Sequence, residues 1–532
     1  MNKRYNYLII STDEERYPPP YETKQIKQFR HQYMPGREAI KKQGLNFNNH
    51  YASSTACAPS RASLYTGHYP SLHGVSQTDG IAKTAVENDM FWLDPDTVPT
   101  MGNYFREAGY DTWYKGKWHV AHSDIDEPGT RNSIATNDTD GTPIAAGVEL
   151  YQQANRLNQY GFNGWVGPEP HGTLKSNTAT VRDPIFANDV VKQLQMLEKR
   201  WQEGDKTPWL VVSSFLNPHD ITLTGVLWKS FGLPTSDDTV PNIPEPPTQD
   251  EDLSQKPDCQ GDYATRYKQI VLPQVQTPEY RKFYYYLHKY VDEQIKQVYD
   301  FISQSAFFDD TIVILTADHG EMLGAHGGIH QKWYNAYQET IHVPLTFSNP
   351  VLFNQPKATE ILSTHVDLIP TMLGISGLDA NALNQKLQFS HAEAKPLVGR
   401  DLSELILTKG EAQLKDEPVY FQTTDEVSQG ENQTTVTGQP YDAIIQPNQI
   451  RATLAKLEGV LWKYAEYSDE DGTLDTQYEL YNLTDDPIEQ TNLAYPGNET
   501  ELSQKVQPTL TQILADLQQQ KALTPNSYQT SQ

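Results

Sequence analysis

Cysteine is scarce in this sequence, and long hydrophobic runs are missing. Only two cysteines, Cys57 and Cys259, occur in 532 residues, so a disulfide framework is excluded as the basis of the fold. No stretch approaches about 18 consecutive apolar residues, the length that a membrane-spanning helix needs. The apolar run at 7–10 is too short for the core of a signal peptide, and no small-residue cleavage site follows it. We therefore expect a cytoplasmic protein without a membrane partner.

Basic residues are also few. The chain has 42 Lys and Arg against 68 Asp and Glu, which leaves a formal net charge of −26. A protein that binds nucleic acid normally presents a basic face, so nucleic acid is disfavoured as a partner. An acidic shell also repels small anions, and an anionic substrate would need a local cluster of cationic side chains. The 37% of hydrophobic residues, with 16 Phe, 9 Trp and 31 Tyr, suffices for a sizeable core, and the length favours two domains.

The stretch 57–67, CAPSRASLYTG, combines a cysteine with the start of a helix. Pro59 suits the first turn of a helix, where its missing N–H group costs nothing, and the following residues can continue the helix. Cys57 is therefore predicted to lie just before a helix N-terminus, where unpaired N–H groups and the helix dipole favour anions. The ordinary alternative for a lone cysteine is a buried structural role.

The pattern Cys57-x-Pro59-x-Arg61 resembles the signature of the sulfatase family, in which this cysteine is oxidised to formylglycine. The tail of the stretch, Leu-Tyr-Thr-Gly, resembles that family as well. The resemblance continues at further segments from about residue 5 to residue 520. It implies the alkaline-phosphatase-like α/β fold, in which a large mixed β-sheet is sandwiched by helices and a smaller C-terminal α+β subdomain is attached. We assign residues 1–410 to the catalytic domain and 411–532 to the subdomain.

Two apolar runs, at 7–12 and 311–316, are typical of buried parallel strands and are followed by metal-binding side chains at 13–14 and 318–319. In open α/β sheets, ligands bind outside the carboxyl ends of the strands. A metal site at this edge of a sheet is therefore expected.

The resemblance implies that Asp13, Asp318 and His319 bind one divalent cation next to Cys57. Glu14 replaces the second aspartate of the family, so it is either a longer ligand or has been lost from the set. Oxygen ligands together with one His are compatible with Ca²⁺, Mg²⁺ and Mn²⁺, and we expect Ca²⁺.

Cationic residues in three further segments resemble those that bind the sulfate group in the family. Lys117 and His119 belong to the segment WYKGKWH at 113–119. Because they are two residues apart, their side chains would face the same side of an extended strand. His219 follows the apolar strand 209–215, and Lys332 follows the second metal-binding pair. The resemblance implies that Arg61 and Lys117 hold the nucleophile and that His119 acts as a base. His219 and Lys332 would bind the transferred group and help to protonate the leaving oxygen.

A hydrated aldehyde at position 57 carries two hydroxyls on one carbon. One can attack sulfur, and the other can then expel sulfate, so that one difficult step becomes two. We therefore expect an enzyme that hydrolyses sulfate esters, with a small anionic ester as substrate and a formylglycine-generating enzyme as maturation partner. A phosphonate monoester or phosphodiester hydrolase would use the same residues, and a non-catalytic metal-binding relative is a further alternative. A homo-oligomer is compatible with the sequence, and the organic part of the substrate is left open.

Other segments carry weaker signals. The stretch 229–278, rich in Pro and acidic residues and containing Cys259, is interpreted as a loop or lid that helps to select the substrate. His171 is placed in a loop at the rim of the site or in a structural role, and His326 and His330 are candidates for substrate contact. The segment 280–304 has apolar residues at helical spacing, and a C-terminal helix from about 499 to 519 is expected to pack on a small antiparallel sheet.

Overall fold

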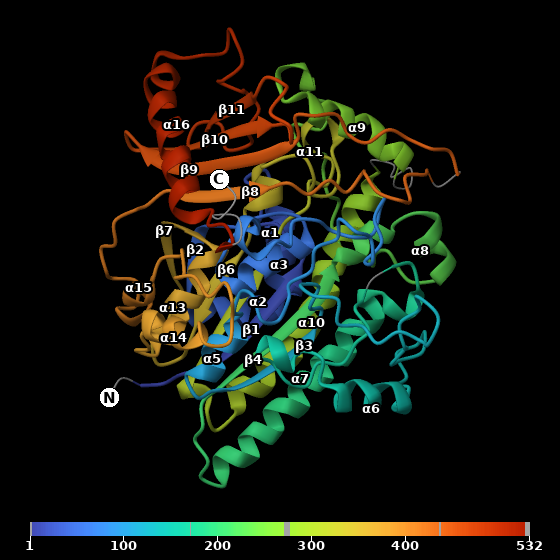
Figure 1. Ribbon diagram of the computed structural model, residues 1–532, viewed down its shortest axis with the longest axis vertical. Coiled ribbons are helices and arrows are strands. Elements are labelled where there is room, and N and C mark those ends of the chain that lie inside the picture. Colours follow the sequence, from blue (N-terminus) through green and yellow to red (C-terminus); the bar gives the residue numbers. More distant parts are fainter. Residues whose placement is uncertain (1–2, 171, 271–276, 436–437, 527–532) are drawn as a thin grey trace.

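The computed structural model describes residues 3–170, 172–270, 277–435 and 438–526 (Figure 1). In this part of the chain, a seven-stranded mixed sheet has the order β3-β4-β1-β5-β6-β2-β7. β6 runs antiparallel to its neighbours β5 and β2, and the other pairs are parallel. The strands are β1 (Asn6–Asp13), β2 (Gly44–Tyr51), β3 (Asp111–Gly116), β4 (Trp209–Pro218), β5 (Thr311–Ala317), β6 (Leu345–Ser348) and β7 (Lys357–Thr364).

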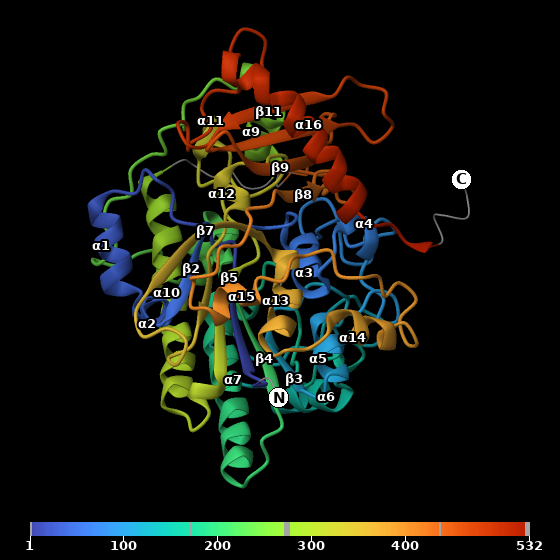
Figure 2. The same cartoon turned by 90° about the vertical axis from the view of Figure 1, so that its left-hand side faces the viewer.

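β1 is buried on both faces, as the unbroken apolar run of its sequence predicts. Its side chains alternate between two cores, since Tyr7 and Ile9 face one and Leu8 and Ile10 face the other. Helices cover both faces of the sheet, which lies between them in Figure 2. One face is covered by α2 (Pro35–Lys42), α7 (Ala179–Gln202) and α10 (Pro278–Gln304). The other is covered by α3 (Cys57–Thr66), α5 (Met101–Glu107) and α13 (Leu368–Ile375), with α14 (Ala380–Leu387) and α15 (Ser403–Leu407) beside them. The predicted sandwich is thereby confirmed.

A second, antiparallel sheet has the order β11-β10-β9-β8. Its strands are β8 (Val419–Thr423), β9 (Gln449–Leu457), β10 (Val460–Ser468) and β11 (Gln477–Asn482). The apolar side chains Val506, Leu510 and Leu514 of α16 (Glu501–Lys521) pack on Trp462 and Leu480 of this sheet. The expected C-terminal sheet and helix are therefore present, and the domain boundary at residue 410 stays a prediction.

The interpretation of 229–278 as a loop or lid is wrong for its second half. Residues Asp258–Ile270 form the helix α9, which contributes Cys259, Tyr263 and Tyr267 to a core shared with the small sheet. These residues recur every four positions, so they line one helix face. Cys259 is thus a core residue that helps to join the two sheets. In Figure 1, α9 lies beside the small sheet.

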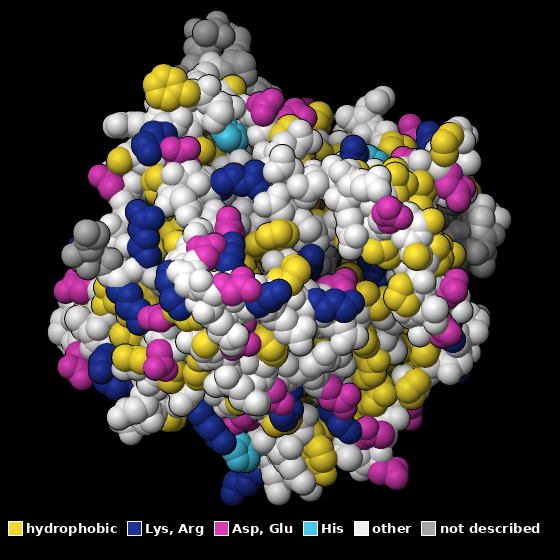
Figure 3. Space-filling view, turned by 90° about the horizontal axis from the view of Figure 1, so that it is seen from below, with side chains coloured by type: hydrophobic (Ala, Val, Ile, Leu, Met, Phe, Trp, Pro, Cys, Tyr) yellow, Lys and Arg dark blue, Asp and Glu magenta, His cyan; other side chains and the backbone are white. Residues whose placement is uncertain are grey.

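The remaining helices are short or lie in connections: α1 (Lys24–Tyr33), α4 (Pro70–His73), α6 (Ala145–Ala154), α8 (Val226–Phe231), α11 (Ala325–Gly328) and α12 (Gln338–Ile341). No helix among the described residues is both long and apolar enough to cross a membrane. On the face shown in Figure 3, Lys and Arg side chains are interspersed with Asp and Glu, and no continuous basic patch forms there.

Candidate active site

The carboxyl ends of β1, β4 and β5 bring the two predicted metal-binding pairs together. Ser11 of β1 is in register with Ser214 of β4 and with Thr316 of β5. A bulge follows Ser11, and Asp13 then lies opposite Pro218. The parallel register therefore places residues 13–14, 219 and 318–319 at one edge of the sheet.

Cys57 is the first residue of α3 rather than the residue before it, and Ala56 is the N-cap. Its side chain is fully buried, with Sγ 3.6 Å from Oδ1 of Asp13 and 3.1 Å from Nε2 of His319. Burial, with the nearby Asp13 carboxylate, raises the pKa of the Cys57 thiol to about 12. The unmodified thiol is therefore uncharged at neutral pH, and it is not a thiolate nucleophile.

Arg61, one helical turn after Cys57, binds both acidic strand ends. Its Nε donates to Asp318 at 2.9 Å, and its Nη2 lies 3.2 Å from Asp13. A third donor, Nη1, reaches the backbone oxygen of Lys117 at 2.8 Å. The guanidinium group thus holds the two carboxylates in place, rather than touching Cys57 directly as the resemblance implied.

The sequence predicted that Lys117 and His119 face the same side of a strand. This prediction is wrong, because β3 ends at Gly116, before both residues. Gly116 has φ +104°, and a Cβ there would lie 1.8 Å from the backbone oxygen of Ser214, so only glycine fits this turn. Nζ of the buried Lys117 lies 2.7 Å from Asp13. Nε2 of His119 lies 2.7 Å from Oδ1 of Asp79, a residue that sequence reasoning missed.

The electrostatics of Asp13 follow from these neighbours. Burial alone would raise its pKa, but the positive charges of Lys117, His219 and Arg61 hold the pKa of Asp13 well below its usual range. Asp13 is therefore a permanent carboxylate at neutral pH, as a metal ligand must be.

Four donor groups, from Asp13, Cys57, Asp318 and His319, have ligand atoms within 4.8 Å of one another, and all four residues are buried. Nδ1 of His319 lies 3.0 Å from the carbonyl oxygen of Gly320. Nδ1 can thus donate to that carbonyl, which leaves the lone pair of Nε2 directed at the other three donor groups. Carboxylate oxygens and one imidazole suit a hard or borderline divalent cation, so these residues fit the metal ion that the sequence predicted.

Glu14 lies outside that group of four. Its backbone N–H donates to Oδ1 of Asp318 at 3.0 Å, while its carboxylate pairs with Nζ of Lys332 at 3.0 Å. Burial raises the pKa of Glu14, and the charge of Lys332 opposes that rise. Glu14 also has a carboxylate oxygen within 4.8 Å of donor atoms of Asp13 and His219. The side chain predicted as a possible ligand is thus engaged with the lysine.

Cys57, His219 and Lys332 line one cavity of about 340 Å³. Asp79 lines this cavity and also an adjoining one of about 550 Å³, where His119 lies. Of the predicted cationic residues, therefore, two face the cavity directly. Lys117 and His119 do not line this cavity. Nζ of Lys117 contacts Asp13, and Nε2 of His119 contacts Asp79.

Two further histidine candidates, His326 and His330, do not line this cavity. His326 is buried, with Nδ1 2.7 Å from Glu251, and its ring stacks on Tyr337. His330 is also buried and stacks on Tyr267. Both rings belong to the packed interior, and His171 lies outside the described residues.

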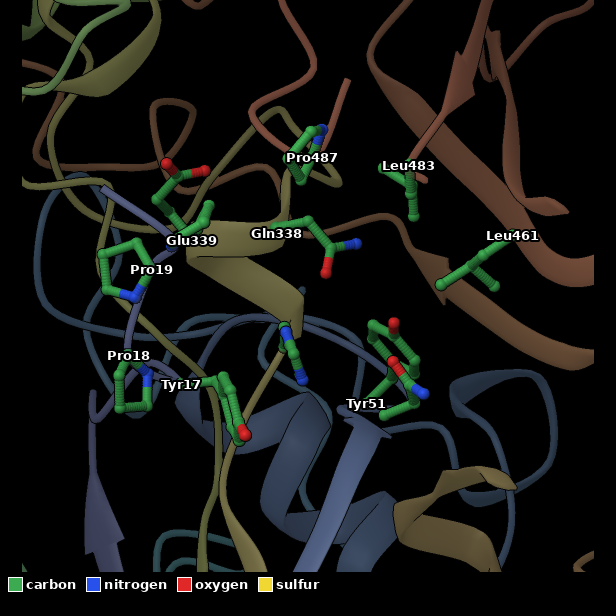
Figure 4. Close-up of a pocket in the computed structure, with 12 residues that line it drawn as sticks. Tyr17, Pro18, Pro19, Tyr51, Gln338, Glu339, Leu461, Leu483 and Pro487 are labelled. Atoms are coloured by element: carbon green, nitrogen blue, oxygen red, sulfur yellow. The ribbon is translucent and has the colours of Figure 1, made fainter. Parts of the chain in front are cut away.

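A separate cavity of about 290 Å³ lies between the loop after β1 and the small sheet (Figure 4). Tyr17, Tyr51, Gln338 and His342 line it, and the rings of Tyr17 and His342 stack at 4.1 Å. None of the predicted catalytic or metal-binding residues lines this cavity. Gln338 and His342 thus lie away from the cavity of Cys57.

The family model described as Sulfatase matches residues 5–378. This chain belongs to the sulfatase family. The choline-sulfatase of Rhizobium meliloti (strain 1021) is 23% identical over 469 residues, which cover 87% of this chain and 78% of the relative. A solved 2-O GAG sulfatase has a TM-score of 0.63 and 20% identity, covering 100% of this chain and 94% of its own. The phosphonate monoester hydrolase of Silicibacter pomeroyi has a TM-score of 0.62 and 19% identity, with coverage of 98% and 96%.

The structural likenesses show the fold, and membership of the sulfatase family makes the chain an enzyme that hydrolyses sulfate esters. Membership also implies a metal ion and a formylglycine derived from a cysteine. Cys57 is the cysteine that lies among possible metal ligands, whereas Cys259 is packed in the core.

Proposed function

We propose that this sulfatase hydrolyses a sulfate monoester bound in the cavity above residue 57, with formylglycine at that position as the nucleophile. The observation that carries the proposal is the group of four buried donors at the start of α3 and the ends of β1 and β5. We propose Asp13, Asp318 and His319 as ligands of one Ca²⁺, because carboxylates predominate in the set; Mg²⁺ and Mn²⁺ are the alternatives.

The bound cation and the hydrated aldehyde supply charge neutralisation and a hydroxyl nucleophile. The residues of the chain orient these groups. Arg61 and Lys117 fix the Asp13 carboxylate, so that the ligand set keeps its geometry when substrate enters. Lys332 and His219, which line the cavity, bind the negatively charged oxygens of the ester, and His219 gives a proton to the leaving oxygen. The Asp79–His119 pair takes up the proton released at residue 57.

Maturation must precede folding in this proposal. Every residue of α3 is buried, and the exposed fraction of Cys57 is 1%. A separate formylglycine-generating enzyme could not reach the thiol in the folded chain, so we propose that it acts on the unfolded segment around Cys57.

A phosphonate monoester hydrolase is the second candidate, since a solved enzyme of that kind has the same fold over nearly all of this chain. Arg61, Lys117 and the proposed metal ligands would serve phosphonate as well as sulfate. The two candidates differ only in which anionic ester is turned over faster.

The test uses protein co-expressed with a maturation enzyme and loaded with Ca²⁺. We expect the peptide containing residue 57 to show aldehyde in mass spectrometry. We expect para-nitrophenyl sulfate to be hydrolysed faster than para-nitrophenyl phenylphosphonate, and a chelator to stop turnover. Cys57→Ala should lower kcat more than about 10³-fold, as loss of a nucleophile does, whereas the matched variant Cys259→Ala should keep the activity of folded protein. Full activity from protein whose Cys57 is unmodified would refute the proposal, and faster phosphonate turnover would favour the second candidate.

A further inference from the structure

The cavity above residue 57 has an apolar wall. Beyond the anion-binding end formed by Cys57, His219 and Lys332, its bulky side chains come from four separate segments: Ile81, Leu223, Leu227, Ile270 and Trp333. Uncharged polar side chains complete the lining: Thr78, Thr173, Thr222, Gln331, Thr434 and Thr435. The part of the cavity beyond the anion-binding end thus combines bulky apolar side chains with uncharged polar ones.

Trp333 makes this wall rigid. Its Nε1 donates to Asp425 at 3.0 Å, and Nζ of Lys332 lies 4.9 Å from the centre of its rings. The exposed fraction of Trp333 is 7%. A flat apolar surface is therefore held directly beside the lysine that we assign to the sulfate group, with its polar edge already satisfied.

Cations are few in the cavity. Among its described lining residues, Lys332 is the sole Lys or Arg, and it is paired with Glu14. Asp79 adds a negative charge. The chain segments that follow Ile270 and Thr435, VLPQVQ at 271–276 and VT at 436–437, contain no Lys or Arg in the sequence. Among the described lining residues, no Lys or Arg besides Lys332 could pair with a second anionic group on the substrate, so burying that group there would be costly.

The adjoining cavity also has few Lys or Arg side chains that could bind a second anionic group of the substrate. Its described lining includes Lys83, Arg131 and two histidines, with four acidic residues: Asp79, Asp124, Asp126 and Glu169. Burial raises the pKa of Glu169 to about 8, so this residue adds little negative charge at neutral pH. Nζ of Lys83 already forms an ion pair with Asp89 and donates a hydrogen bond to Gln77 at 2.9 Å. An extended polyanion that continued from the first cavity into the second would meet Asp79, Asp124 and Asp126 there.

We propose that the substrate is the sulfate monoester of a compact apolar alcohol or phenol without a further negative charge, rather than a carboxylated or multiply sulfated sugar. This inference rests on the proposed sulfatase function. The sulfate end binds to Lys332 and His219, and the apolar group lies against Trp333, Leu223 and Leu227. Specificity then comes from apolar contact and from the lack of a partner for a second anion.

The test compares kcat/KM of the formylglycine-bearing enzyme for hexyl sulfate and for a primary sulfate ester on a uronic-acid-containing disaccharide. Both leaving groups are primary alcohols, so leaving-group acidity does not decide the outcome, and released sulfate is measured by ion chromatography. We expect hexyl sulfate to be preferred at least about tenfold, the ratio produced by about 1.4 kcal/mol. Preference for the anionic sugar overturns this inference but leaves the sulfatase function intact. If verified formylglycine enzyme with metal cleaves no sulfate ester of either kind, the proposed function itself fails.

Variants locate the cause of the preference. Leu227→Lys adds a cation to the half-buried wall, and Phe389→Lys adds the same charge at a side chain that is 93% exposed and does not line the cavity. We expect Leu227→Lys to shift the ratio toward the anionic sugar by about tenfold and Phe389→Lys to leave it unchanged. Should Leu227→Lys not fold, Leu227→Ala should lower the ratio of hexyl to methyl sulfate turnover. Equal ratios in all of the folded variants would overturn the inference.

Discussion

Glu14 differs by one methylene from the aspartate that the family has at this position, and its contacts differ accordingly. Its carboxylate lies 3.0 Å from Nζ of Lys332, while its backbone N–H supports Asp318. The second residue of the acidic strand end therefore orients a cation of the substrate cavity. Asp13, Asp318 and His319 remain as the proposed metal ligands.

Metal binding should distinguish these roles. Asp318→Asn removes a charged donor from the group of four and should lower the affinity for Ca²⁺ by at least about tenfold, because carboxylate charge dominates binding of a hard cation. Glu14→Gln should change that affinity less and should instead raise KM, since Lys332 loses its partner. Calorimetric titration of metal-free protein gives the affinities independently of activity. The reverse order of the two variants would show that Glu14 is the stronger ligand.

The loop after β3 shows how one element positions several residues of the site. The strand ends at Gly116, and His119 has φ +53°. Glu169, in a connection about fifty positions further along, accepts the backbone N–H groups of Trp118 at 3.2 Å and of His119 at 2.8 Å. This carboxyl group, whose pKa burial raises to about 8, holds the turn that presents Lys117 to Asp13. We therefore infer that Glu169 is a positioning residue.

Glu169→Gln tests this role, because the amide keeps one acceptor oxygen and places an N–H₂ group where the second carboxyl oxygen accepts the backbone N–H of Trp118. We expect kcat to fall by about tenfold to a hundredfold while KM changes little, as expected for a misplaced catalytic loop. Glu149→Gln, an isosteric change at an exposed position of α6, is the matched control. If kcat of Glu169→Gln equals that of the control, the loop does not depend on this carboxyl group.

For the whole molecule, buried carboxyl groups connect stability with pH. Asp183 in α7 accepts backbone N–H groups of Leu216 and Asn217 at the end of β4, and burial raises its pKa to about 8. Burial likewise raises the pKa of Glu489 to about 7, although the charge of Lys463 opposes this. Both groups bind protons more tightly in the folded chain than in the unfolded one. Their contribution to stability is complete below the unfolded pKa and is lost as pH rises through the folded pKa.

We therefore expect the free energy of unfolding to fall between pH 7 and pH 9, with Asp183 accounting for about 1 kcal/mol of that loss. Urea denaturation followed at several pH values measures the slope. Asp183→Asn cannot titrate and should flatten the slope, whatever its effect on absolute stability. A slope that is identical in the variant would mean that Asp183 is charged in the folded protein at pH 7.

The location of the protein in the cytoplasm and its oligomeric state stay predictions from the sequence. The organisation of the site does not depend on them, since every proposed ligand and cation belongs to this one chain. Among the described residues, the core to which α9 contributes Cys259 contains side chains from both sheets.

The sequence by itself determined the elements that local pattern encodes. Apolar runs of strand length specify β1 and β5, and helical spacing specifies α10. The motif around Cys57 identifies the family, whose resemblance also predicts the residues that meet at the proposed metal site. These predictions from the sequence succeed because strand and helix periodicity, and the parallel register of neighbouring strands, constrain where each residue lies.

Only the tertiary structure decided how distant side chains pair. It joins Glu14 to Lys332 and His119 to Asp79, buries His326 against Tyr337, and turns part of a supposed lid into the helix α9. No periodicity encodes such contacts, because they arise where loops from separate segments are packed together. The apolar wall of the substrate cavity has the same origin: its side chains are far apart in the sequence and acquire a common function only when the folded chain excludes water between them.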